Sequence, residues 1–138
     1  MSAVKKSVHR ETTIAEAMSN PVLTVEVDES LWDAWQLLFV SGLRHLVVLN
    51  EDGVCLGVLS DRNILAEVPA TRENLNRRKV REVLATAPLV CVSPDQSPLA
   101  AAKVMADNAI EAVPVLDSSG RLVGVMTQFD IITWLVRG

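Results

Sequence analysis

The sequence is poor in the side chains that most catalytic and metal-binding sites require. Its 138 residues include two histidines, His9 and His45, and two cysteines, Cys55 and Cys91. The cysteines have no metal-ligand spacing and lie inside apolar runs, which predicts buried, reduced thiols. Nucleophile-elbow, P-loop and paired-carboxylate patterns are also absent from the sequence. We therefore expect no catalysis, no metal site and no required cofactor.

Long hydrophobic runs and an excess of positive charge are absent as well. A run such as 45–49 is far shorter than the roughly 20 apolar residues that cross a bilayer, and no signal-peptide core follows the charged start of the chain. These absences predict a cytoplasmic protein with no membrane partner. The formal net charge of −4 and the pI of about 5.1 argue against a protein that coats nucleic acid. Basic clusters at 5–10 and 72–81 are explained at least as well as solvated connectors.

What the sequence does contain is a repeat of itself. The composition, 49% hydrophobic and 22% charged, is typical of one compact domain or of two small ones that share a core. When the chain is shifted by 67 positions, the segment GVLSDRN at 57–63 falls on GVMTQFD at 124–130. The match continues upstream to Pro21 on Pro88 and needs one inserted residue before these prolines. A single gap over about fifty aligned positions indicates an internal duplication.

Both copies predict the same order of elements. A short helical turn comes first, followed by a strand, a long helix, a hairpin of two strands and a closing helix. The strands are expected at 21–25, 45–49, 88–92 and 112–116, the hairpin turns at 50–53 and 117–120, and the closing helices from about 61 and 128. The residues expected to start or end helices are Thr13 with Glu16 as a capping box, Ser30 and Ser97 as N-caps, Pro98 at the first helical position, and Gly42 and Asn108 at left-handed ends.

This order, with G-x-x-[ST]-x-x-[DN] at the last junction of each copy, resembles the CBS motif, the cystathionine β-synthase type repeat. Two copies in tandem resemble a CBS pair, or Bateman module, and the resemblance covers about residues 13–136. It implies an α/β fold of two tandem repeats, β-α-β-β-α each, packed by pseudo-two-fold symmetry into one compact module. The expected division is an N-terminal extension at 1–12, repeat 1 at 13–66, a linker at 67–78 and repeat 2 at 79–136.

The side chains of the heptapeptide match two groups that an adenosine nucleotide offers, its phosphate and its ribose hydroxyls. Its glycine allows a close approach to the strand, and its hydroxyl lies at a helix N-terminus, where N–H groups favour phosphate. The acid or amide lies one helical turn further on and can hold the two hydroxyls of a ribose. The same residues also match plain helix capping, with a hydroxyl at the N-cap and a polar side chain at N3.

The resemblance implies ligand clefts that bind adenosine-containing molecules, with the base against the first strand of the partner repeat. For the second motif the expected ligand-binding residues are Gly124, Thr127 and Asp130, with Thr24 from the other repeat. For the first motif they are Gly57, Ser60, Asn63, Arg44 and His45, with Cys91 from the other repeat. AMP, ADP, ATP, S-adenosylmethionine and a dinucleotide all remain open as ligands, because they share the adenosine group.

The two copies differ just before the second strand. Copy one has Arg44 and His45 where copy two has Glu111 and Ala112. The resemblance implies that residues at this position face the ligand's phosphates, so we expect a stronger phosphate field in copy one. We expect a better ribose anchor in copy two, because a carboxylate holds a diol more firmly than an amide does. A surface cation at Arg44 and a partly buried strand histidine at His45 explain those two residues equally well.

The tryptophans point to a partner surface. Trp32 and Trp35 lie on a helix whose apolar surface is wider than one core-facing stripe, which predicts contact with another subunit, although internal packing accounts for at least one of the tryptophans. The resemblance to CBS pairs implies that this contact is a homodimer through the long helices. The favoured function is a regulatory module that senses an adenosine-containing nucleotide and acts on a separate, unidentified regulated protein. The alternatives are a ligand-free dimeric scaffold and, least favoured, a protein that contacts nucleic acid.

Overall fold

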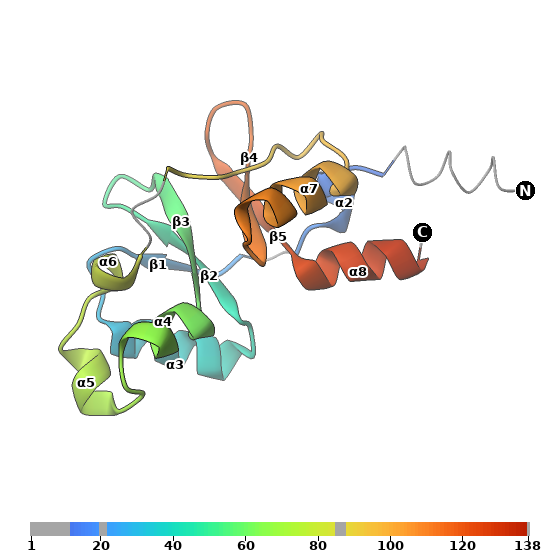
Figure 1. Ribbon diagram of the computed structural model, residues 1–138. Coiled ribbons are helices and arrows are strands. Elements are labelled where there is room, and N and C mark those ends of the chain that lie inside the picture. The colour runs from blue at the N-terminus through green and yellow to red at the C-terminus, as the bar shows by residue number, and fades with distance from the viewer. Residues whose placement is uncertain (1–11, 20–21, 85–87, 138) are drawn as a thin grey trace, which may run out of the picture. The chain divides into compact units, whose positions relative to one another are not determined.

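The computed structural model describes residues 12–19, 22–84 and 88–137 (Figure 1). The helices are α2 (Ile14–Ala17), α3 (Leu31–Ser41), α4 (Asp61–Glu67), α5 (Arg72–Asn76), α6 (Val80–Val83), α7 (Pro98–Asn108) and α8 (Gln128–Arg137). The strands are β1 (Thr24–Glu26), β2 (His45–Leu49), β3 (Cys55–Ser60), β4 (Ala112–Leu116) and β5 (Leu122–Thr127). This mixed α/β order confirms the duplicated pattern that the sequence predicts.

The chain divides into two compact units. The first-repeat unit comprises Leu23–Leu89, and the second-repeat unit comprises the described residues up to Val22 together with those from Val90 onward. The first-repeat unit is built on a three-stranded sheet in the order β1-β2-β3, with β1 parallel to β2 and β2 antiparallel to β3. Its core consists of fully buried aliphatic side chains from the sheet and the helices, among them Leu31, Leu46, Leu59, Ile64 and Leu75.

The second-repeat unit has a shorter sheet than the sequence predicts. β4 and β5 form the expected antiparallel hairpin, but Val92 contributes only one parallel bridge, to Val115, and the predicted strand at 88–92 is wrong in extent. In the first-repeat unit the Val47 N–H donates to the Leu23 carbonyl at 3.0 Å. Pro114 occupies the position equivalent to Val47, and because proline has no N–H this hydrogen bond cannot form in copy two.

The leading helical turn of each repeat packs in the unit that holds the other repeat's strands. α2 lies in the second-repeat unit, where Met18 covers Gly124 of β5, and α6 lies in the first-repeat unit, where Leu84 covers Gly57 of β3. A Cβ added at Gly124 would meet the Met18 sulfur at 2.3 Å. The compact units and the sequence repeats therefore have different boundaries, and the glycine of each motif leaves room for the end of the other repeat's first turn.

The predicted helix starts hold in the long helices. The Ser30 hydroxyl accepts from the Asp33 N–H at 3.1 Å, the Ser97 hydroxyl accepts from the Ala100 N–H at 3.2 Å, and Pro98 is the first residue of α7. The capping box at Thr13 and Glu16 is wrong, because the Thr13 hydroxyl accepts no backbone N–H and instead donates to the Glu16 carboxylate at 3.4 Å.

The predicted left-handed helix ends are half right. Gly42 ends α3 with φ of 74°, as expected, but Ala109 rather than Asn108 takes this conformation at the end of α7, with φ of 53°. Asn108 remains helical and its side-chain amide donates to the Val104 carbonyl at 2.8 Å. Ala109 is the position that the 67-residue shift places opposite Gly42, so the alignment was a better guide than the residue type.

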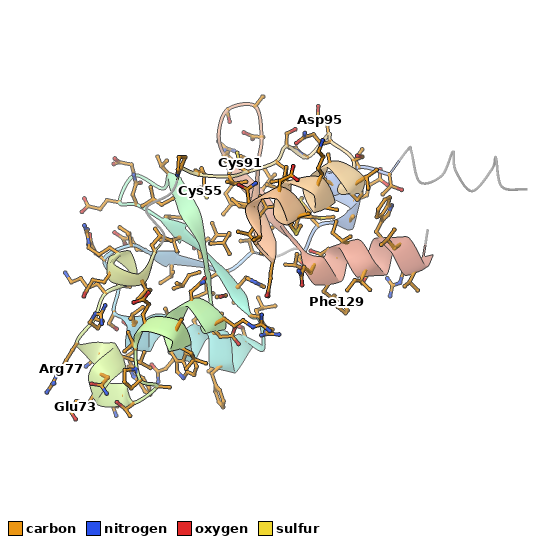
Figure 2. All side chains as sticks on the ribbon, viewed as in Figure 1. Cys55, Glu73, Arg77, Cys91, Asp95 and Phe129 are labelled. Atoms are coloured by element: carbon orange, nitrogen blue, oxygen red, sulfur yellow. The ribbon has the colours of Figure 1, made fainter. Side chains whose placement is uncertain are left out.

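The segment predicted as a linker carries a helix and anchors itself in the core. α5 lies within 67–78, and its Leu75 is fully buried. The basic side chains that follow are paired with acids: Arg77 with Glu73 at 2.7 Å, Arg78 with Glu82 at 2.6 Å, and Arg81 with Asp28 (Figure 2 labels Glu73 and Arg77). These pairs match the interpretation of the cluster as a solvated connector.

Candidate functional site

The motif of copy two joins β5 to α8 through a closed set of hydrogen bonds. The Thr127 N–H donates to Asp130 Oδ2 at 2.9 Å, and the Asp130 N–H donates to the Thr127 hydroxyl oxygen at 3.2 Å. The Thr127 hydroxyl also donates to Asp130 Oδ2, at 3.0 Å. Asp130 is only 9% exposed, although it carries a carboxylate. The motif therefore starts α8 as a reciprocal cap and holds its acid in a shielded position.

A third residue, Ser19, binds the same carboxylate. Its hydroxyl lies 2.8 Å from Asp130 Oδ1 and 3.0 Å from Oδ2, and its backbone N–H donates to the Val125 carbonyl at 3.0 Å. Sequence reasoning missed Ser19 because it lies 111 residues from Asp130 and belongs to no motif. Only the packing of the first turn against β5 brings it there.

The motif of copy one has the same cap in an exposed setting. The Asn63 N–H donates to the Ser60 hydroxyl at 3.0 Å, and the Ser60 N–H donates to Asn63 Oδ1 at 2.9 Å. The Asn63 side chain is exposed, whereas Asp130 is buried. Gly57 has φ of 157° and lies against Leu84. Both motifs thus form the helix caps that the sequence offers as the plain interpretation.

Arg44 and His45 lie beside the motif of copy one. His45 is opposite Ser60 in the β2–β3 register, just as Ala112 is opposite Thr127 in copy two. The Asp61 N–H donates to the Arg44 carbonyl at 3.3 Å, and the Arg44 Nε lies 3.5 Å from Asp61 Oδ2. The Arg44 side chain is 58% exposed, so it is accessible to an anion, but Asp61 offsets part of its charge.

Thr24 and Cys91 were grouped by sequence with the motif of the other repeat. Both are exposed, and each belongs to the unit that does not hold that motif, so their roles stay predictions. The expectation that both cysteines are buried is right for Cys55 and wrong for Cys91. Val92 points into the core, and Cys91, its neighbour, therefore points outward as in a strand of period two.

A groove of about 600 Å³ lies elsewhere in the second-repeat unit, between α7 and α8. Thr127 and Asp130 are not among its lining residues, which are Ala102, Met105, Ala106, Ala109, Ile110, Glu111, Gln128, Ile131 and Ile132. Within 12–19, 22–84 and 88–137, no cluster of three or more His, Cys, Asp or Glu side chains is arranged to hold a metal ion. In the same part of the chain, no helix has the length and apolar character needed to span a membrane.

Comparison with known proteins agrees with the fold. The sequence model of the CBS domain matches twice, at residues 13–70 and 80–137. The CBS domain of a CBS domain containing membrane protein from Sphaerobacter thermophilus superposes with a TM-score of 0.81, at 20% identity over 96% of this chain and 95% of that one. The CBS domain pair of protein MJ0100, solved with 5'-methylthioadenosine and S-adenosyl-L-methionine, gives a TM-score of 0.76 at 25% identity, covering 91% and 97% of the two chains.

A longer relative is an enzyme. Homoserine O-acetyltransferase of Methanococcoides burtonii is 32% identical over 120 residues, which is 87% of this chain. The chain spans only 23% of that enzyme's length. The likeness to it therefore concerns one part of the enzyme.

Proposed function

This chain belongs to the CBS domain family, and on that premise we propose that it is a regulatory module that binds an adenosine-containing nucleotide and acts on a separate partner protein. The observation that carries the proposal is the shielded carboxylate of Asp130 beside the hydroxyl of Thr127, at the start of a ten-residue helix. The similar domain pair solved with 5'-methylthioadenosine and S-adenosyl-L-methionine supports it, because those two ligands share the adenosine group.

The motif residues take different parts of such a ligand. Asp130 accepts from the two ribose hydroxyls, the start of α8 favours an anionic group, and Thr24 of the other repeat contacts the base. In copy one the weaker amide of Asn63 takes the ribose, with Ser60, Gly57 and Cys91 lining the site. Arg44 and His45 face the phosphates there, and Arg44 exchanges Asp61 for the ligand's phosphate when it does so.

A ligand panel tests this function. Thermal unfolding is measured with adenosine, AMP, ADP, ATP and S-adenosylmethionine, with guanosine and ribose as controls. A ligand at 100 times its dissociation constant stabilises the protein by about 2.7 kcal/mol, so the adenosine compounds are expected to raise Tm and the controls are not. Mass spectrometry of the denatured, purified protein identifies what is bound on isolation. If no adenosine compound co-purifies and none raises Tm, the protein is a ligand-free scaffold instead.

The protein's assembly is proposed to be a homodimer through the long helices. Trp32 and Trp35, the residues that suggest it in the sequence, are partly buried and pack on the core of their own unit. Other apolar side chains of the described residues are much more exposed. Phe39 and Val40 of α3 are 82% and 83% exposed, and Phe129 of α8, which projects from its helix in Figure 2, is 74% exposed. Exposed aromatic side chains of this size are typical of interfaces.

Sedimentation velocity tests the assembly. The wild type is expected at twice the mass of the chain at micromolar concentration. Phe39→Asp and Phe129→Asp are expected to give monomer, and Gln36→Asp, an exposed polar position on α3, serves as the matched control. A wild type that is monomeric at this concentration overturns the dimer proposal.

A further inference from the structure

Three donor groups within the second-repeat unit use most of the acceptor capacity of the Asp130 carboxylate. A carboxylate offers about four lone-pair positions on its two oxygens. Oδ2 accepts from the N–H and the hydroxyl of Thr127, while Oδ1 has its shortest contact, 2.8 Å, with the Ser19 hydroxyl. Because the residue is only 9% exposed, few directions of approach to these oxygens remain.

Ser19 is held at this place by more than its side chain. Its N–H donates to the Val125 carbonyl at 3.0 Å in an isolated antiparallel bridge, and the neighbouring Met18 packs directly on Gly124. The hydroxyl is therefore presented to the carboxylate by the fold, at a fixed local concentration, and it competes with any external donor. The Thr127 contacts differ, because they form the cap of α8 and must persist for the helix to start there.

We propose that Ser19 is an internal competitor for the Asp130 carboxylate, so that a ligand with a vicinal diol binds only by displacing the Ser19 hydroxyl from it. This rests on the proposed function and adds a control to it. A diol needs two acceptor positions. Both positions of Oδ1 are open once the serine side chain turns away, while Oδ2 keeps its two hydrogen bonds from Thr127. The exchange replaces one hydroxyl donor by another, so the measured affinity is set by the difference between the two.

The competition is tested with Ser19→Ala and Ser19→Thr by titration calorimetry. Ser19→Ala removes the competing hydroxyl and is expected to bind adenosine and AMP about tenfold more tightly than the wild type does. Ser19→Thr keeps a hydroxyl and is expected to bind as the wild type does. 2',3'-Dideoxyadenosine has no diol, so its affinity is expected to be the same for all three proteins.

Three outcomes overturn the proposal. If Ser19→Ala binds adenosine more weakly, Ser19 contacts the ligand, and if affinity is unchanged, Ser19 does not compete for the carboxylate. If adenosine and its dideoxy analogue tighten equally, the effect does not pass through the diol. In all three cases adenosine still binds, so the proposed function survives. If neither the wild type nor Ser19→Ala binds any of the compounds, both proposals fail together.

Thermal unfolding without ligand is expected to show a lower Tm for Ser19→Ala, because the contact with Asp130 is lost.

Discussion

The two motifs of this chain share a cap and differ in everything that surrounds it. In copy one the side-chain amide of Asn63 is exposed, and its oxygen accepts the N–H of Ser60 in the capping box. In copy two the carboxylate of Asp130 is buried and also bonds to Ser19. The same sequence motif therefore forms an exposed helix cap in copy one and a helix cap with a buried carboxylate in copy two. The difference shows that the same local motif can end up exposed or buried, depending on the long-range partners that pack on it.

The largest expected difference between the motifs is in stability. Asp130→Ala leaves the N–H of Thr127 and the hydroxyl of Ser19 without their acceptor in a shielded place, so we expect a loss of about 1.5 to 3 kcal/mol. Asn63→Ala removes one exposed, neutral acceptor and is expected to cost about 0.5 to 1.5 kcal/mol. Urea unfolding of both variants without ligand measures this. Equal losses would mean that the burial of Asp130 contributes nothing.

The motif glycines, Gly124 and Gly57, sharpen the comparison, because alanine is expected to destabilise the protein at each of them for a different physical reason. At Gly124 the new Cβ meets the Met18 sulfur at 2.3 Å, so Gly124→Ala is expected to cost about 1 to 3 kcal/mol through overpacking. Met18→Ala removes the clash, and the double variant is expected to be more stable than the sum of the single losses predicts.

At Gly57 the backbone itself is the obstacle. Its φ of 157° is one that side-chain-bearing residues rarely adopt, while Leu84 lies at 3.3 Å from the new Cβ. Leu84→Ala therefore does not rescue Gly57→Ala, and the two losses are expected to add. Double-mutant cycles by urea unfolding check both pairs, and rescue at Gly57 would place its constraint in packing instead.

Most of the fold was predictable from the sequence because its signals are local. N-cap serines and turn glycines act over a few residues, and they placed the long helices and both hairpins correctly. The repeat then carried each assignment from one copy to the other. The shortened first strand of copy two follows from the missing N–H of Pro114, which matters only once the strand partner is known. The contact of Ser19 with Asp130 could not be predicted, because no local pattern joins residues 111 positions apart.

A smaller effect is expected at the phosphate end of copy one. Arg44 is 58% exposed and paired with Asp61, so its attraction for phosphate is partly offset. Arg44→Ala is expected to lower the affinity for ATP about threefold relative to that for adenosine. Asp61→Asn is expected to raise the affinity for ATP by a similar factor, because it releases Arg44 from its ion pair. Gln128→Asp adds the equivalent acid to copy two as a matched control. Titration calorimetry measures the ratio of the ATP affinity to the adenosine affinity for each protein. The same ratio for the wild type, Arg44→Ala and Asp61→Asn would exclude Arg44 from phosphate binding.

The smallest expected effect concerns the two first turns, whose third residues are Glu16 and Glu82. The Lys79 N–H and then the Arg78 guanidinium donate to Glu82 and lower its pKa below the ordinary 4.5. The Glu16 carboxylate instead accepts a 3.4 Å hydrogen bond from the Thr13 hydroxyl. A lowered folded-state pKa stabilises the fold above the ordinary pKa, and this contribution is lost as pH falls through the folded value. Glu82→Gln is therefore expected to destabilise slightly at pH 7 and not at pH 3, as measured by urea unfolding. A Glu82→Gln loss that is the same at both pH values would exclude this linkage.

The most direct test of the central claim, that Asp130 anchors an adenosine ligand and does more than cap α8, is titration of Asp130→Asn with adenosine. Asn63 shows that an amide caps a helix in this frame, so the variant is expected to fold and to keep its helix start. Because a charged acceptor bonds about twice as strongly as a neutral one, we expect adenosine affinity to fall by about tenfold, with a smaller loss of stability than in Asp130→Ala. Unchanged adenosine affinity in a folded Asp130→Asn protein would contradict the account, and Asp130 would then be a cap alone.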